Sequence, residues 1–144
     1  MTFQGGNGAG VPAFTVSAII PGIAVITSPV STTDGGSAIV DTSQDLSVTW
    51  TPISIGQVDF KLSGGDYSPG GVSISLACTF DGATGAGVVS RTLLSSMKGM
   101  AGTSSTYASL TSSLQETTVV GRLTIVTQSS QNTPADRAFN VTLQ

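Results

Sequence analysis

The stretch VSISLACTF (residues 72–80) decides the fold class of this 144-residue chain. Apolar residues occupy every second position from Val72 to Phe80, and Ser, Ala or Thr stands between them. Because successive side chains of a β-strand point to opposite faces of a sheet, this period of two predicts a strand with one buried face. We expect Cys78 on that buried face, where a thiol packs as a small hydrophobic group.

The same alternation recurs along the chain. LSVTW (residues 46–50) and VDFKL (residues 58–62) each place their apolar residues on one side. Residues 137–143 repeat the pattern, with Phe139, Val141 and Leu143 expected inward. Shorter apolar runs bounded by Gly, Pro, Asp and Ser predict further strands at residues 13–19, 23–28, 37–41 and 88–89.

The second half of the chain also contains less regular segments. Residues 92–97 predict one or two helical turns, with Thr92 as the cap and Leu93, Leu94 and Met97 on one face. Residues 104–113 are ambiguous between a loop and an irregular strand. Residues 117–127 predict one long strand and residues 128–134 a loop. In that strand we expect three side chains inward and two outward: Val119, Leu123 and Ile125 inward, Arg122 and Thr124 outward.

Many short strands with one minor helix and no strand–helix–strand rhythm predict an all-β fold. The expected architecture is an antiparallel immunoglobulin-like β-sandwich with one short helical turn. Residues 1–12 are expected to be a flexible Gly-rich lead-in, and residues 13–144 a single β-sandwich domain.

Composition narrows the possible partners and the location. Charged residues make up 9% of the chain, and Ser with Thr make up about 28%, so hydroxyl groups rather than charges dominate the expected surface. Five basic residues spread thinly along the chain argue against nucleic-acid binding. No apolar run approaches the roughly 18 residues of a membrane-spanning helix. We therefore expect the mature part of an exported protein, extracellular or at a cell surface.

Two resemblances support this reading. DLSVTWTP (residues 45–52), followed by VDFKL, resembles the second and third strands of fibronectin-type and related immunoglobulin-like domains, where an apolar-x-apolar-x-Trp strand ends in a turn with proline. A looser likeness over most of the chain, carried by DLSVTW, SLACTF (residues 75–80) and GAG (residues 85–87), is to predicted bacterial surface lipoproteins of unassigned function. This second resemblance implies that the Gly-rich start is a tether.

Catalytic chemistry is disfavoured by the residue types present. The chain has no His, so it cannot form a Ser-His-Asp triad, a His-assisted Cys nucleophile or a His metal site. Glu116 is the single Glu, and most Asp residues stand beside Gly or Ser, as is typical of turns. Asp34 and Asp81, each followed by Gly, lack the ligand spacing of a calcium loop. We expect no enzyme activity, no cofactor and no metal.

The remaining candidates are binding residues. Tyr67 and Asp66 lie in GGDYSPGG (residues 64–71), which we expect to be a loop, and Tyr107 is a second aromatic candidate. The first hypothesis is a non-enzymatic structural or adhesion module that acts through protein–protein contacts or self-association. One alternative is a carbohydrate-binding module that stacks sugars on Tyr67 or Tyr107. Another is a virion or tail decoration protein.

Overall fold

The computed structural model describes residues 1–6, 8, 11, 13–30, 37–65, 71–101, 106–132 and 139–144. These residues form β-strands, one α-helix and one 3-10 turn. In chain order the elements are β1 (Thr2–Gly5), β2 (Phe14–Ser17), β3 (Ile26–Ser28), β4 (Ala38–Val40), β5 (Leu46–Trp50), β6 (Gln57–Gly65), β7 (Ser73–Asp81), η1 (Gly82–Thr84), β8 (Ala86–Val89), α1 (Arg91–Ala101), β9 (Thr106–Val120), β10 (Leu123–Asn132) and β11 (Phe139–Leu143).

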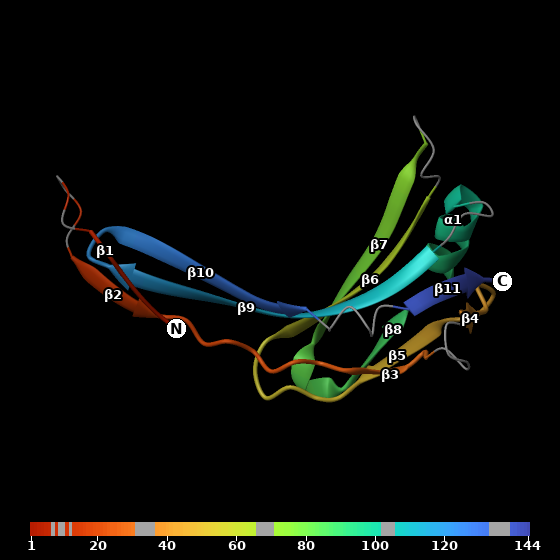
Figure 1. Cartoon of the computed structure of the whole chain (residues 1–144), viewed down its shortest axis with the longest axis horizontal. Helices are drawn as coiled ribbons and strands as arrows, with labels where there is room; N and C mark the ends of the chain where they lie inside the picture. Colours follow the sequence, from red (N-terminus) through yellow and green to blue (C-terminus); the bar gives the residue numbers. More distant parts are fainter. Residues whose placement is uncertain are drawn as a thin grey trace.

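Within the described residues the strands form three sheets (Figure 1). The large sheet has the order β4-β11-β9-β6-β7, and β10 pairs with β9 as its sixth strand. The second sheet has the order β3-β5-β8, and β1 pairs with β2 in the third. The pairing of β4 with β11 is parallel, whereas the other pairings are antiparallel. The predicted all-β, largely antiparallel class is confirmed.

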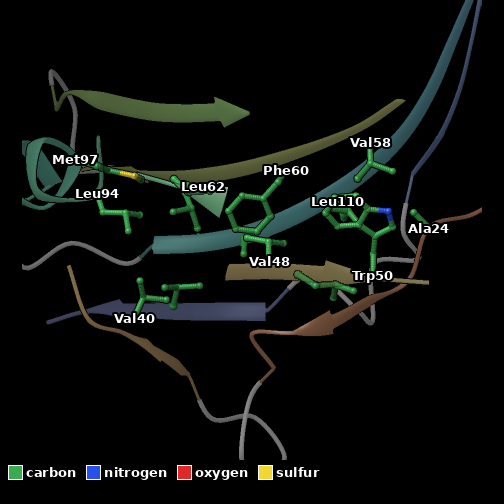
Figure 2. Packing of buried hydrophobic residues seen from close by; sticks show 14 of the residues in the cluster. Ala24, Val40, Val48, Trp50, Val58, Phe60, Leu62, Leu94, Met97 and Leu110 are labelled. Atoms are coloured by element: carbon green, nitrogen blue, oxygen red, sulfur yellow. The ribbon is translucent and has the colours of Figure 1, made fainter. Parts of the chain in front are cut away.

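The core lies between the large sheet and the β3-β5-β8 sheet (Figure 2). From β6, Val58, Phe60 and Leu62 are fully buried, as their alternation predicts. From β5, Val48 and Trp50 are buried opposite them, and the indole N–H of Trp50 donates a hydrogen bond of 3.1 Å to the Gly82 carbonyl. Trp50 is therefore a core residue whose polar atom is satisfied inside the fold.

Strand β7 confirms the alternation that decided the fold class, although its apolar row is only half-buried. Ile74, Leu76, Cys78 and Phe80 pack against the core, while the residues between them are exposed. The row is half-buried because β7 is the last strand of its sheet and has a neighbour on one side only. Val72 was predicted inward, and this prediction is wrong: it precedes the strand and is 70% exposed.

Helix α1 is longer than expected, at 11 residues. Leu94 and Met97 are buried as predicted, but Leu93 is 45% exposed, so its predicted place on the buried face is wrong. The helix begins at Arg91, whose backbone N–H donates to the Asp45 carboxylate at 2.8 Å. Asp45 thus supplies, from a distant part of the chain, the acceptor that a helix N-terminus requires.

A long hairpin projects from the large sheet. Strand β9 pairs with β6 only as far as Ser113, and beyond that residue it continues with β10 alone. We call residues 114–131 the arm. Figure 1 shows it reaching away from the rest of the large sheet, with β1 and β2 near its far end.

The prediction of one strand over residues 117–127 is wrong, because a turn divides this stretch between β9 and β10. Leu123 pairs with Val120, so Gly121 and Arg122 form a two-residue hairpin loop. Gly121 has a φ of 63°, the positive value that such tight turns demand at their first position. Glycine favours the reversal at this position, because without a Cβ atom it adopts a positive φ at little steric cost.

Three further expectations fail in this region and at the N-terminus. Val119 was predicted inward but is 68% exposed. Residues 128–132, expected in a loop, belong to β10. Residues 2–5, expected within the flexible lead-in, form β1 and pair with β2 in a regular register.

Candidate protein-interaction site

One face of the arm is fastened to the segment that follows β2. The backbone N–H of Ile19 donates to the Glu116 carboxylate at 3.0 Å, and the Ser129 hydroxyl donates to the Ile19 carbonyl at 2.7 Å. At the base of the arm, the backbone N–H of Ala24 donates to the Ser112 hydroxyl at 2.9 Å. Because these partners are about a hundred positions apart in sequence, the fold itself must bring them together.

A hollow of about 560 Å³ separates the β1–β2 ribbon from β10. Its apolar lining includes Phe3, Phe14, Val16 and Ile125, and among the described residues no Asp, Glu, Lys or Arg side chain lines it. This volume lies within the range of roughly 300–1,000 Å³ found for ligand pockets. The hollow is thus large enough to accept side chains from another molecule.

The backbone edge of β10 borders the hollow. Residues 125–131 all line it, without a gap. Because alternate side chains of a strand point to opposite faces, consecutive residues can share one hollow only along the strand's edge. The β1–β2 ribbon contributes chiefly one face, since Phe14, Val16 and Ala18 line the hollow at every second position and Phe3 pairs with Val16. Gln4 of β1 lines the hollow as well.

Within the described residues, that edge of β10 has no charge, proline or bulge to oppose pairing with another chain. In the described residues β10 pairs with β9 alone. Its sequence LTIVTQSSQN contains no charged residue, proline or glycine, and its ten-residue register with β9 has no bulge. Natural edge strands are commonly blunted by charges, proline, bulges or short length. Strand β10 therefore offers a long and regular pairing edge.

The outer face of the arm is exposed and uncharged. The exposed side chains that point to this face are Gln115, Thr117, Val119, Thr124, Val126, Gln128 and Ser130. The two valines are 68% and 55% exposed. The charged side chains of the arm are Glu116, which bonds to Ile19 on the inner face, and Arg122 in the turn. A partner on the outer face would therefore meet neutral groups.

The candidate residues from the sequence lie elsewhere. Tyr67 and Asp66 fall outside the described residues. Tyr107 lies on β9 in the body of the large sheet, 39% exposed, on the face turned away from the core. It stands opposite Asn140 of β11 and Ser63 of β6. The structure thus places Tyr107 in a polar row across the sheet and not at the arm.

Asp residues of the described chain have local structural roles. The Asp81 carboxylate accepts the Ala83 N–H at 3.0 Å and caps η1, as its expected place in a turn implies. Asp41 accepts hydrogen bonds from Ser43, which lower the pKa of its carboxyl below the ordinary value. Among the residues described, no three His, Cys, Asp or Glu side chains group to hold a metal ion. Asp34 lies outside the described residues.

The thiol of Cys78 faces the core from β7. Burial raises its pKa above the ordinary value, so the reactive thiolate is disfavoured. In the described part of the chain, no helix has the length and apolar character needed to cross a membrane. Comparison with protein-family models, with curated proteins and with solved structures finds no match to this chain.

Sequence reasoning missed the arm as a site. A signal was present in VGRL (residues 120–123), where a glycine between apolar strands marks a two-residue turn. The hollow has no comparable signal, because it depends on β1, β2 and β10 meeting in space.

Proposed function

We propose that this chain is a non-enzymatic structural or adhesion module, extracellular or at a cell surface, that contacts protein chains through the arm. The observation that carries the proposal is the backbone edge of β10, which pairs with no strand among the described residues and lies beside an apolar hollow. An edge strand of this length without charges or proline is a template for pairing with another chain.

The construction of the arm supports the same function. An isolated two-stranded hairpin is marginally stable in water, and further strands or a packed layer are needed to stabilise it. Here the β1–β2 ribbon supplies a layer on one face only, and Val119 and Val126 stay exposed on the other. A partner chain that extends the arm's sheet would therefore stabilise it as well as bind to it.

Sedimentation velocity over a concentration series tests the proposal. We expect the weight-average mass of the wild type to rise with concentration. Val126→Lys places an ammonium group on the pairing strand and is expected to weaken association by about tenfold or more, since charge on an edge strand opposes pairing. The matched control is Ile39→Lys, a similar change at a 65% exposed residue of β4. A wild type that stays monomeric, or equal effects of the two variants, would contradict the proposal.

A carbohydrate-binding module is the second candidate, and the polar row around Tyr107 favours it. Tyr107 stands on an exposed sheet face between Asn140 and Ser63, so an aromatic ring lies among hydrogen-bonding side chains that suit a sugar. A glycan array with the wild type, Tyr107→Ala and Tyr67→Ala tests this candidate. Glycan binding that Tyr107→Ala abolishes would support it, and the absence of any glycan signal would remove it.

A virion or tail decoration protein remains an alternative within the first class. Such a protein would also act through contacts between repeated chains, and the low charge of the arm would serve it equally well.

A further inference from the structure

We propose that β10 pairs antiparallel with β10 of a second copy of this chain across a two-fold axis. The sheet would then continue from one copy to the other as β9-β10-β10-β9. This inference rests on the proposed function and names the partner of its interaction site. It also gives the contact a closed, self-complementary geometry.

The hollow favours an extended strand as its occupant. The wall formed by β10 is a backbone edge, and a backbone edge is satisfied by the N–H and C=O groups of another strand. The opposite wall is the apolar side of the β1–β2 ribbon, with Phe3, Phe14 and Val16. A strand added to β10 would bond along one side and pack alternate side chains on this ribbon.

The charge pattern favours a second copy over a charged partner. Every residue of β10 is uncharged, so antiparallel self-pairing places no like charges opposite one another in any register. Among the described residues, neither the hollow nor the outer face of the arm offers a charged side chain to complement an acidic or basic partner, and the Met1 ammonium at the hollow is bonded to the Ala18 carbonyl at 2.9 Å. In a concentrated solution of this chain, β10 of a second copy is an uncharged strand that is always present.

The size of the contact suits a weak, concentration-dependent dimer. A ten-residue strand is about 34 Å long and the four-residue strands of the β1–β2 ribbon about 14 Å, so two layers each about 10 Å deep offer a strip of roughly 480 Å² per copy. This area is smaller than the roughly 800 Å² per partner of a standard interface and falls among transient contacts.

Strand β7 is the other long edge, and its surroundings differ. It carries Asp81 at one end, whereas β10 has no charged residue. Helix α1 and strand β8 contact β7, and the Phe80 ring fills the space beside Gly87.

A cysteine scan of β10 tests the two-fold pairing. In a Cys78→Ala background, cysteine replaces each of residues 124–130 in turn, and disulfide-linked dimers are measured after mild oxidation. A two-fold axis places only one residue of an antiparallel pair directly opposite its own copy, and neighbours on the same face lie about 7 Å further along the strand. A disulfide requires Cα atoms about 4.4–6.8 Å apart. We therefore expect one sharp maximum of dimer yield in the scan.

The matched control is Val119→Cys, which places a thiol at a 68% exposed position on the outer face of the arm but on β9. The maximum should exceed this control several-fold. Yields that are equal along β10 or no higher than the control, while the wild-type mass still rises with concentration, would overturn the two-fold pairing and leave the proposed function standing. A wild type that stays monomeric would overturn both.

Discussion

Replacing Ser112 by alanine removes the bond that fastens the N-terminal segment to the base of the arm. The Ser112 hydroxyl accepts the Ala24 N–H at 2.9 Å, and both residues are 1% exposed. Alanine is smaller by one oxygen atom, so the cavity cost is minor, but a buried N–H loses its acceptor. An unsatisfied buried donor costs about 1–3 kcal/mol. We expect the free energy of unfolding to fall by that amount.

Urea unfolding measures the loss. With a slope of about 2 kcal/mol per molar urea, typical of small proteins, the midpoint should fall by roughly 0.5–1.5 M. The control is Ser75→Ala, an exposed site on β7 where we expect a change within about 0.5 kcal/mol. If Ser112→Ala unfolds at the same urea concentration as this control, the bond does not hold the segment and the reasoning is refuted.

Three further changes have defined outcomes. Gly121→Ala places an L side chain at a φ of 63°, where no neighbouring atom would contact the new methyl group. The backbone conformation alone should therefore lower the free energy of unfolding by about 1–2 kcal/mol in a thermal unfolding experiment. An unchanged Tm would contradict this. Gly82→Ala would place a methyl group too close to the Ile53 side chain and the Gly56 carbonyl, so the free energy of unfolding should fall by about 1–3 kcal/mol in the same assay. A variant as stable as the wild type would show that the site has room for the methyl group. Since burial raises the pKa of Cys78, the unfolded chain ionises first. The free energy of unfolding should therefore decline as pH rises through the ordinary thiol value of about 8.5, and Cys78→Ala should remove that decline. Equal pH dependence of the two proteins would refute the assignment.

The central strands were predictable because their side chains alternate. In β5, β6 and β11 the residues expected inward are buried or half-buried, and Val58, Phe60 and Leu62 are fully so. A sheet with one buried face imposes this period on the sequence, and local inspection therefore recovers it. The immunoglobulin-like identity of the arrangement stays a prediction.

The hairpin of the arm could not be predicted from alternation in the same way. Val119 and Val120 precede Gly121, and Leu123 and Ile125 follow it, so the apolar pattern continues through the turn as if one strand passed there. The polar end of β10, residues 128–132, resembles a loop in sequence, yet it pairs along β9. The inner face of the arm is covered by residues 19–24, a contact that no local pattern encodes. The interaction site lies where long-range packing decides the structure.

Hydrogen–deuterium exchange of the backbone amides along β10 tests the central claim most directly. In dilute protein, the amides that point to the outer edge of this strand should exchange rapidly, because no other strand of the described chain pairs with that edge. In concentrated protein the same amides should exchange markedly more slowly, while those on the outer edge of β7 stay unchanged. Exchange along β10 that is independent of concentration, or protection that appears on β7 in its place, would contradict the account.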